Sequence, residues 1–362
     1  MKPKDTHALH LWLRAETKPN ESRSPITPQT ARVLLDQGLE VTVERSPSRI
    51  FDDADFQREG CILAPPASWP DAPSKAFILG LKEVPQSTAP LRHRHIYFAH
   101  AFKGQSGSNA LLGRFKEGGG TLLDLEALTH TGGRRVAAFG YWAGYVGTAL
   151  ALASWFLQRE GVTLADLKAF HSQDQLDEFV RQQKARHSEN QQLAPQCLII
   201  GAKGRSGQGA IRCIEKHAVP ATLWDLEETA GGGPFTEING HDILINCVLL
   251  SEPTPPFVTL ESLENNERLR TIIDVSCDPH HPYNPIPIYR EHTSFACPSR
   301  SIEQSSIQLI SIDNLPSLLP RESSEDFASQ LLPHLIELGS WSLPWINAQT
   351  AFEEACRDCH DA

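Results

Sequence analysis

Residues 197–229 read CLIIGAKGRSGQGAIRCIEKHAVPATLWDLEET, and this stretch decides how the chain is interpreted. An apolar run ends at Gly201, and a turn containing Gly204 and Gly207 follows it. A helical pattern then leads to a second apolar run, which ends in Asp225. A strand, a glycine turn, a helix, a second strand and an acid, in this order, are what a dinucleotide-binding unit requires. The alternative is a glycine-rich loop in an ordinary α/β domain.

The turn has a definite chemical use if it faces a pyrophosphate. Glycines let the backbone approach the phosphates, and the start of a helix offers N–H groups and a positive dipole end. The spacing is G-x-x-G-x-x-G, and Asp225 follows Gly207 by 18 residues. Asp225 can accept hydrogen bonds from the adenosine ribose and repel a 2′-phosphate, and two further acids follow it without a nearby arginine. The stretch therefore predicts NAD rather than NADP.

Length and composition bound the class of protein. A chain of 362 residues predicts two domains, and 40% hydrophobic with 21% charged residues is typical of a soluble globular protein. The formal net charge of −11 argues against a nucleic-acid partner. Residues 1–5 lack the apolar core of a signal peptide. We therefore expect a cytoplasmic protein whose eight cysteines are free thiols rather than a disulfide framework.

The segment from Val136 to Leu157 contains no charged residue. Its length alone permits a membrane span. It is rich in Ala, Gly, Ser and Thr, however, and it lies between two segments of soluble character. We therefore predict a buried helix that joins two domains, and no membrane partner.

Short apolar runs that alternate with helical patterns predict a parallel α/β fold. A helix is expected to start at Thr27-Pro28, where a threonine N-cap precedes a proline. Helical spacing at 164–170 and 176–180 predicts surface helices in a connector, and helical patterning returns from Ser324. Strands are expected near residues 9–15, 41–44, 76–80, 97–100, 121–124, 242–248, 271–276 and 307–312.

Polar residues follow four of the expected strands in the first third of the chain. Because the carboxyl ends of parallel strands share one edge of a sheet, we expect these residues to form a common site. They are Arg14, Lys18, Glu21 and Arg23 after the first strand, then Lys82 and Glu83, then His100, Lys103 and Gln105, and finally Glu126.

Two patterns of cysteine and histidine in the sequence could form ligand sites. Residues 356–360 have the C-x-x-C-H form of c-type haem attachment, but no export signal accompanies them, so we interpret the match as coincidence. The histidines at 93–100 and at 280–281 have no second half at metal-ligand spacing. We predict no metal.

Several stretches together resemble the NAD-dependent, lysine-forming saccharopine dehydrogenases. The opening R-x-E and E-x-R pattern is shared more broadly with alanine dehydrogenases and transhydrogenases. The remaining stretches are specific to the family and follow one another along nearly the whole chain. They read LRAETKP at 13–19, GLKE at 80–83, FAH at 98–100, RRVAAFG at 134–140, GGGPF at 231–235, DVS at 274–276, NPIPIY at 284–289 and SIDNLPSLLPRE at 311–322.

The resemblance implies two Rossmann-like domains with parallel sheets flanked by helices, and an active-site cleft between them. Residues 1–135 with 322–362 would form the substrate-binding domain. Residues 136–321 would form the NAD-binding domain, including a connecting helix at 136–160. The family contains a cysteine after the turn arginine in some fungal members, which can pair with one matching Cys247, but Ser206 stands here, so no such disulfide is expected.

The resemblance also implies roles for individual residues. Lys82 and His100 match the acid–base groups. The substrate would be held by Arg23, Gln105, Arg135, Phe139, Ser276 and Asp278, to which the strand-end pattern adds Lys103. The NAD contacts would come from Arg134, Gly201, Gly204, Arg205, Gly207, Asp225, Thr229, Val275, Ile312, Asp313, Asn314 and Leu315.

The chemistry suits these residue types. Saccharopine is a secondary amine with three carboxylates, so its site needs guanidinium groups. Hydride transfer leaves an imine, which water must split into lysine and 2-oxoglutarate. Lys82 suits the removal of the amine proton, and His100, which titrates near neutrality, suits the activation of water. The local charge is expected to be tuned by Lys18, Glu21, Glu83 and Glu126.

The expected partners are therefore the small molecules saccharopine, lysine and 2-oxoglutarate, with NAD as cofactor, in a monomer or small homo-oligomer. The route would be lysine biosynthesis through α-aminoadipate. Two alternatives stay open. One is a related opine-type dehydrogenase with a different amine or 2-oxo acid, and the other is a non-catalytic NAD-sensing protein.

Overall fold

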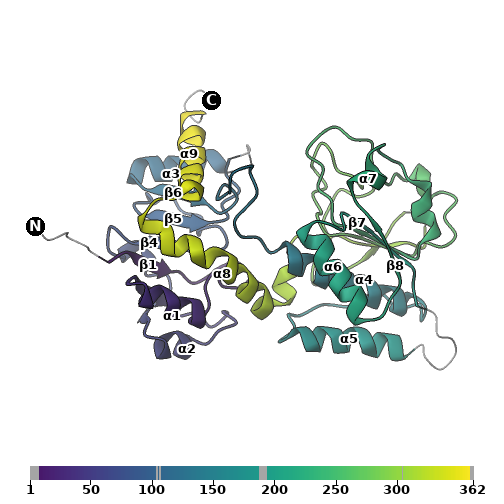
Figure 1. The fold of residues 1–362 in the computed structure, drawn as a ribbon, viewed down its shortest axis with the longest axis horizontal. Helices are drawn as coiled ribbons and strands as arrows, with labels where there is room; N and C mark the ends of the chain where they lie inside the picture. The colour runs from purple at the N-terminus through teal and green to yellow at the C-terminus, as the bar shows by residue number, and fades with distance from the viewer. Residues whose placement is uncertain (1–7, 103–104, 106, 187–193, 304, 359–362) are drawn as a thin grey trace, which may run out of the picture. The chain divides into compact units, whose positions relative to one another are not determined.

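Two mainly parallel sheets organise the protein in a computed structural model, which describes all residues except 1–7, 103–104, 106, 187–193, 304 and 359–362. The chain forms two compact units, Met1–Ala138 with Ser323–Ala362 and Phe139–Glu322, called here the first and the second unit (Figure 1). The predicted α/β class with strands in parallel is confirmed.

The first unit is built on six parallel strands in the order β3-β2-β1-β4-β5-β6. Helix α9 packs on β6 and beside α3. The elements are β1 (His10–Leu13), α1 (Pro28–Asp36), β2 (Glu40–Glu44), α2 (Asp53–Arg58), β3 (Ile62–Ala64), the 3-10 turn Trp69–Asp71, β4 (Phe77–Leu79), β5 (Arg94–Tyr97), α3 (Ser108–Gly118), β6 (Thr121–Asp124), most of α8 (Pro320–Ile336), the 3-10 turn Glu337–Gly339 and α9 (Leu343–Asp358).

The start of α1 shows how closely local sequence can determine an element. Thr27 is the N-cap, its side chain accepts the backbone N–H of Thr30, and Thr30 Oγ1 in turn accepts the N–H of Thr27. Pro28 occupies the first helical turn, where its missing N–H costs nothing. The predicted helix start is confirmed.

The fourth expected strand of this unit lies earlier than predicted. The apolar run at 97–100 indicated the strand, but β5 spans Arg94–Tyr97 and His100 lies beyond it. The reason is His95, which is fully buried in edge contacts with the rings of Trp69 and Phe115. Burial lowers the pKa of His95 to about 3, so the ring is neutral and behaves as a core residue.

The second unit has six strands in the order β11-β12-β10-β9-β7-β8, all parallel except the short edge strand β11. The elements are α4 (Gly140–Gln158), α5 (Gln173–Ala185), β7 (Cys197–Ile200), α6 (Arg205–Lys216), β8 (Ala221–Trp224), α7 (Leu226–Thr229), the 3-10 turn Thr236–Gly240, β9 (Ile243–Asn246), the 3-10 turn Glu261–Leu263, β10 (Thr271–Asp274), β11 (Arg300–Ser301), β12 (Gln308–Ile310) and the 3-10 turn Leu315–Leu318.

Helix α4 is the uncharged segment of the sequence, and it is buried from Gly144 to Leu157. It crosses α6 at close range, because a Cβ on Gly144 would overlap the carbonyl oxygen of Ser206, and one on Gly209 would overlap that of Tyr141. The predicted buried helix is confirmed. Among the residues described, no helix combines the length and apolar character that a membrane span needs.

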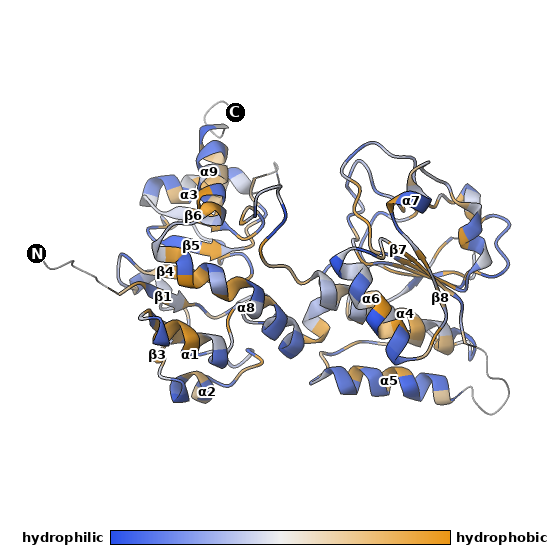
Figure 2. Cartoon of the chain, viewed as in Figure 1, coloured by the Kyte–Doolittle hydropathy of each residue, from blue (hydrophilic) through white to orange (hydrophobic). Residues whose placement is uncertain are grey.

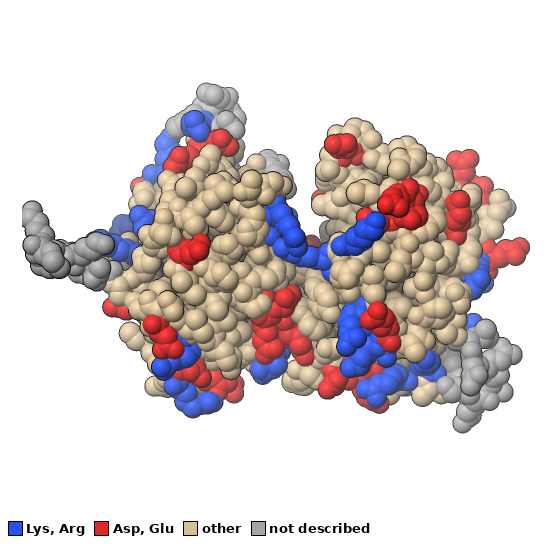
Figure 3. Space-filling view, in the orientation of Figure 1, with Lys and Arg blue, Asp and Glu red and all other residues tan. Residues whose placement is uncertain are grey.

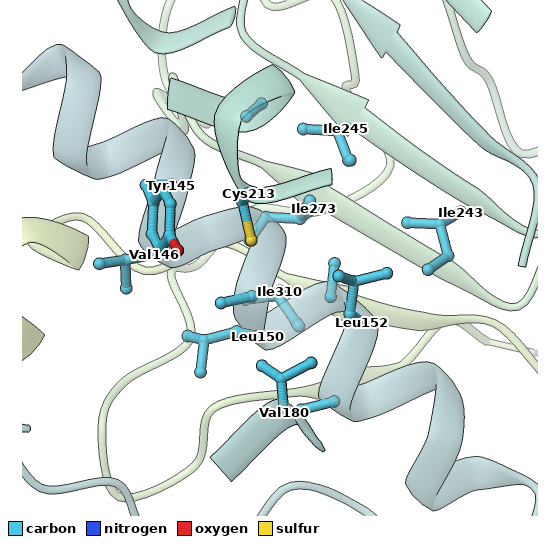
Figure 4. Close-up of a cluster of buried hydrophobic side chains, with 14 of the residues drawn as sticks. Tyr145, Val146, Leu150, Leu152, Val180, Cys213, Ile243, Ile245, Ile273 and Ile310 are labelled. Atoms are coloured by element: carbon cyan, nitrogen blue, oxygen red, sulfur yellow. The ribbon is translucent and has the colours of Figure 1, made fainter. Parts of the chain in front are cut away.

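The main core of the second unit lies between α4, α5, α6 and the sheet (Figure 4). Val146 and Leu150 of α4, Val180 of α5 and Cys213 of α6 meet Ile273 of β10 there. The strands of both sheets carry many of the hydrophobic residues in Figure 2, whereas α5 carries polar residues along its length.

The connector was predicted to hold surface helices, and this was wrong for residues 164–170. Among the residues of the connector that the structure describes, only those of α5 form a helix. The backbone N–H groups of Leu167 and Phe170 donate instead to the carbonyl oxygens of Phe295 and Leu318. These tertiary partners replace the helical ones, and Leu164 and Leu167 are buried in the core.

Several smaller expectations can be compared with the described residues. The seven cysteines among them are free thiols, as predicted. The helical tail begins at Pro320, four residues before the predicted start. Of the C-x-x-C-H pattern, 359–360 lie outside the described residues, whereas Phe352 on α9 packs in the core of the first unit.

Candidate active site

Strands β1, β4, β5 and β6 are neighbours in the first sheet, so their carboxyl ends lie at one edge. Lys82 follows the last residue of β4 by three positions, and His100 follows that of β5 by three. Glu126 follows β6 by two. Contacts between the segments after these strands connect the candidate residues, as described below.

The backbone of Lys82 is held from both sides by residues that follow β1. Its N–H donates to Oε2 of Glu16 at 3.1 Å, and its carbonyl oxygen accepts a hydrogen bond from Nη2 of Arg14. Oε1 of Glu16 also accepts the N–H of Leu81 at 2.7 Å. The sequence placed Arg14 in the common strand-end site and gave no role to Glu16. It did not indicate that either contacts Lys82, because these contacts join residues more than 60 positions apart.

Glu21 and Arg23 form a buried ion pair in the same loop. Nε and Nη2 of Arg23 donate to the two oxygens of Glu21 at 2.8 and 2.6 Å, and both side chains are at most 3% exposed. Burial opposes the ionisation of Glu21, but Arg23 and the positive charge of Lys82 hold the pKa of Glu21 below its usual value. The charge of Lys82 is therefore felt at Glu21.

His100 contacts Glu126, which also binds Arg135. Nδ1 of His100 lies 3.6 Å from Oε1 of Glu126, and Nη2 of Arg135 donates to the same oxygen at 2.9 Å. The hydrogen bond to Glu126 raises the pKa of His100, although partial burial acts in the opposite direction. His100 has a φ of 51°, and its ring stacks on Phe98. A half-exposed imidazole with a carboxylate partner is suited to proton transfer.

Asp124 lies beneath this pair as the last residue of β6. It is 1% exposed, and it accepts the backbone N–H groups of Glu126 and Ala99. Burial raises the pKa of Asp124 to about 6. This buried carboxyl therefore supports the backbone on which His100 and Glu126 stand. The sequence indicated only its strand.

Lys18 and Glu83 form a further charge pair at this edge, and it is exposed to solvent. Nζ of Lys18 is 3.9 Å from Oε2 of Glu83, and each side chain is almost half exposed. Of the other substrate residues predicted in this part of the chain, Gln105 is partly buried and Arg135 lies on Glu126. Lys103 lies outside the described residues.

A pocket of about 460 Å³ opens beside His100. Glu83, Tyr97, Leu111 and Arg114 are among the residues that line it with His100. Tyr97 is fully buried from water by its neighbours, and the guanidinium of Arg14 lies 5.6 Å from the centre of its ring. The sequence did not indicate this pocket, since α3 contributes to it from a surface-type helix pattern.

The glycine turn of the second unit has the predicted form. Gly201 follows β7 with a φ of +87°, and Gly204 is the N-cap of α6 with no side-chain hydrogen bond to the helix. A Cβ on Gly207 would overlap the carbonyl oxygen of Gly201, so glycine is required for α6 to pack this close to the turn. Arg205 is the first helical residue and is half-buried.

Asp225 stands next to the turn because β8 pairs with β7. Its Oδ2 accepts the backbone N–H of Lys203 at 2.7 Å, and its Oδ1 accepts that of Leu226 at 3.0 Å. Thr229 donates its hydroxyl to the carbonyl oxygen of Asp225. Nζ of Lys203 lies 3.8 Å from Glu227, so this nearby cation has an acidic partner.

A buried hydrogen-bond network lies at the carboxyl end of β10. Asp274 accepts from Tyr289 Oη at 2.7 Å, from Asn246 Nδ2 at 2.9 Å and from Ser276 Oγ at 3.1 Å. Burial raises the pKa of Asp274 despite these donors. Of the predicted substrate residues, Ser276 belongs to this network, whereas Asp278 is exposed.

The other predicted cofactor and substrate residues are spread over several segments. Phe139 directly precedes α4, and Arg134 is an exposed residue of the first unit. Val275, Ile312 and Leu315 bury their side chains in the core of the second unit, so only their backbone is available to a ligand. Asp313 is exposed, and Asn314 donates to Ser317.

The residues of the second unit fit a dinucleotide. The N-terminus of a 12-residue helix begins at a glycine, and the partly buried carboxylate of Asp225 stands beside it. The first feature suits a pyrophosphate and the second a ribose diol. Within the described residues, no group of three or more His, Cys, Asp and Glu side chains is arranged to hold a metal ion.

Comparison with known proteins supplies the family. A family model described as "Alanine dehydrogenase/PNT, N-terminal domain" matches residues 12–146. The fold is also that of an L-alanine dehydrogenase structure, with a TM-score of 0.67 at 16% identity over 96% of this chain and 94% of that chain. At this identity the likeness concerns the fold alone.

Curated sequences are much more similar. The chain is 48% identical over 343 residues to the "Saccharopine dehydrogenase [NAD(+), L-lysine-forming]" of Emericella nidulans, covering 91% of this chain and 92% of the relative. It is 45% identical over 360 residues to the protein of the same name from Schizosaccharomyces pombe, covering 96% and 98%. The chain therefore belongs to the family of the NAD(+)-dependent, L-lysine-forming saccharopine dehydrogenases.

Proposed function

We propose that the protein oxidises L-saccharopine with NAD+ and releases L-lysine and 2-oxoglutarate, in a reaction that also runs in reverse. The observation that carries this proposal is the identity of 48% with a relative of that name over nine tenths of the chain. The charged edge of the first sheet supports it, since a substrate with three carboxylates and an amine needs cations and proton-transfer groups together.

NAD+ would be held by the second unit. The start of α6 at Gly204 and Arg205 would take the pyrophosphate, and Asp225 the adenosine ribose. The backbone near Val275 and at 312–315, with Thr229, would complete the contacts made by this unit. Arg134, which belongs to the first unit, is a further proposed contact. When bound, NAD+ supplies a hydride acceptor for the carbon that bears the secondary amine.

Lys82 is the proposed base for the proton of that amine. Its backbone is fixed by Arg14 and Glu16, and its charge lies close enough to Glu21 to lower the pKa of that carboxyl. Lys82 must be in its neutral amine form to accept that proton. A primary amine on a flexible side chain can follow the nitrogen of the substrate, and the fixed backbone limits the volume it must search.

His100 is the proposed acid–base group for imine hydrolysis. Its imidazole takes a proton from water as the oxygen attacks the imine carbon, and it returns a proton to the departing lysine nitrogen. Glu126 stabilises the protonated ring. Arg23, Gln105, Arg135, Phe139, Ser276 and Asp278, with Lys103, are the proposed substrate contacts, and Lys18, Glu21, Glu83 and Glu126 the proposed charge-tuning groups.

The first test is the substrate. NADH consumption is followed with 2-oxoglutarate and a panel of amino acids, and lysine is expected to support the fastest turnover. Absence of turnover with lysine together with turnover of another amine would replace this proposal with an opine-type dehydrogenase. Turnover with NADPH is expected to be much slower than turnover with NADH. Asp225→Ala is expected to weaken NAD binding and to reduce the preference for NADH over NADPH.

The second test concerns the acid–base pair. Lys82→Met and His100→Gln are each expected to lower kcat by on the order of 10²- to 10⁴-fold while NADH binding, measured by fluorescence titration, stays within about twofold. Loss of NADH binding in either variant would contradict the assigned roles. Full activity in either variant would remove that residue from the mechanism.

A further inference from the structure

Both peptide groups that flank Lys82 are bound by side chains of one short segment. Glu16 accepts the N–H of Lys82 at 3.1 Å and that of Leu81 at 2.7 Å, while Arg14 donates to the carbonyl oxygen of Lys82. Arg14 and Glu16 also contact each other, with Nη1 and Oε2 3.5 Å apart. The segment after β1 therefore holds the segment after β4 at the residue proposed as the base.

The pair is buried, so its hydrogen bonds are shielded from water. The side chain of Arg14 is 1% exposed and that of Glu16 is 6% exposed. Charge-assisted hydrogen bonds are about twice as strong as neutral ones. Burial strengthens them further, because the dielectric constant inside a protein is lower than in water. The guanidinium of Arg14 lies directly against Gly80, where any Cβ would overlap it.

Two other charged residues of the first unit, Glu44 and Arg49, also bind loop backbone and can be compared with Glu16 and Arg14. Glu44 is a buried glutamate in the adjacent strand β2, and it accepts the backbone N–H groups of Ala15, Ala67 and Trp69. Arg49 is a buried arginine that donates to the carbonyl oxygen of Glu44 and to Asp53. These groups also organise loops, but none of their partners is a proposed catalytic residue.

We propose that Arg14 and Glu16 are positioning residues for the reaction, which act by fixing the backbone of Lys82 and thereby the reach of its amino group. This inference rests on the proposed function of Lys82. Neither side chain touches the substrate in this account. Their effect on catalysis must therefore pass through Lys82, and it must vanish when Lys82 no longer carries an amine.

A double-mutant cycle on the full-length protein tests this dependence. Glu16→Gln keeps the size of the side chain, but its amide offers only one acceptor oxygen to the two N–H groups. It is expected to lower kcat by on the order of 10- to 100-fold, the effect of displacing a reacting group by about 1 Å. In a Lys82→Met background the same change is expected to lower kcat by less than about twofold. The KM for NAD is expected to stay constant throughout.

Arginine substitutions provide the matched control. Arg14→Lys keeps the charge but cannot reproduce the fork that reaches both Lys82 and Glu16, and it is expected to lower kcat severalfold. Arg49→Lys makes the same chemical change at an arginine whose side chain is 4% exposed, and kcat is expected to stay within about twofold. Thermal unfolding of both variants shows whether they lose comparable stability.

The outcomes separate the two proposals. Equal losses from Glu16→Gln in the wild-type and Lys82→Met backgrounds would overturn the positioning role while leaving Lys82 as the base. A kcat loss in Arg49→Lys equal to that in Arg14→Lys would overturn it as well. Full activity of Lys82→Met alone would instead contradict the proposed role of Lys82 as the base. If Glu16→Gln does not fold, Glu16→Asp, which keeps both acceptor oxygens on a shorter stem, takes its place in the cycle.

Discussion

The carboxyl edges of the two sheets place different groups at the ends of their strands. At the first sheet, buried or half-buried charges meet one another: Arg14 with Glu16, Glu21 with Arg23, and His100 with Glu126. At the second sheet, the segment after β7 is a glycine turn with a helix N-terminus. The same parallel architecture therefore supports a proton-transfer edge in one unit and a backbone-donor edge in the other.

The second unit also contains a buried charge cluster, but it lies among the helices. Asp177 on α5 is fully buried and accepts from Tyr145 Oη at 2.6 Å, with His217 Nε2 at 3.2 Å and Lys216 Nζ at 3.4 Å. In the first unit, buried charges organise the candidate site. In the second, this cluster holds α4, α5 and α6 together, away from the glycine turn. The difference teaches that buried charge alone does not identify a site.

The largest expected effect comes from breaking the helix crossing of the second unit. In Gly144→Ala the new methyl would overlap the carbonyl oxygen of Ser206, so α4 and α6 must separate. We expect a loss of about 3 kcal/mol in stability. Hydrogen exchange read by mass spectrometry should show the loss in peptides of the second unit first.

A glycine of the first unit provides the control for this change. A Cβ on Gly113 in α3 would meet no atom within 4 Å, so Gly113→Ala is expected to stabilise the protein by about 0.5–1 kcal/mol. If Gly144→Ala exchanges as slowly as the wild type, the two helices do not approach through their backbones.

The next effect tests the helix cluster. Asp177→Asn removes the charge that His217 and Lys216 face, and we expect a loss of about 2 kcal/mol at pH 7, measured by urea unfolding. Burial raises the pKa of Asp177, but the hydrogen bonds from His217 and Tyr145 outweigh it and leave the pKa lowered. The stabilisation is therefore present above the unfolded pKa of about 4 and is lost as the pH falls through the folded value.

Asp174 on the same helix is the control, since its side chain is 89% exposed and 3.8 Å from Lys216. Asp174→Asn is expected to change stability by less than about 0.5 kcal/mol. A wild-type and Asp177→Asn difference that stays constant from pH 7 to pH 2 would contradict the ionised form of Asp177 in this account.

A smaller effect is expected at the proton-transfer edge. Glu126→Gln removes the hydrogen bond and the charge that raise the pKa of His100, so His100 should lose its proton at lower pH. An NMR titration of the His100 ring, combined with the pH dependence of kcat, measures this, and kcat near neutrality is expected to fall by about tenfold or less. Because the folded pKa is raised, the pair stabilises the protein below the unfolded pKa of about 6.5, and this contribution is lost as the pH rises through the folded value.

Glu83→Gln gives the comparison for His100, because Glu83 acts on the ring only through its charge and contributes least. Its titration shift is expected to be smaller than that of Glu126→Gln. An equal or larger shift would mean that long-range charge, rather than the contact with Glu126, sets the protonation of His100.

Local signals made part of this architecture predictable from sequence. The glycine turn, Asp225 and the cap at Thr27 are each encoded by neighbouring residues, so their geometry follows from the pattern. The position of β5 was predicted wrongly because His95, a polar residue type, is buried as a neutral ring in the core. Burial of that kind depends on tertiary contacts with Trp69 and Phe115, which no local window contains.

The sequence predicted several residues of the candidate site but not the contacts between them. The strand-end pattern selected Lys82, His100 and Glu126, and the structure shows His100 and Glu126 in contact. It did not indicate that Arg14 and Glu16 bind the backbone of Lys82, because hydrogen bonds to peptide groups leave no complementary residue type in the sequence. The network around Asp274 was missed because its donors Tyr289 and Asn246 lie 15 and 28 positions away along the chain.

The smallest effect is expected from the exposed pair at the first edge, Lys18 and Glu83. Their charged atoms are 3.9 Å apart and each side chain is almost half exposed, so water and salt screen the attraction. Lys18→Ala should therefore change the free energy of unfolding by less than about 0.5 kcal/mol, and high salt should abolish the difference. The buried pair Glu21 and Arg23 lies in the same loop, and Glu21→Gln should cost several times more because it leaves a buried guanidinium without its carboxylate. Equal losses from Lys18→Ala and Glu21→Gln would show that the loop is held by its surface charge, and the proton-transfer edge would then rest on solvent-screened contacts rather than on buried ones.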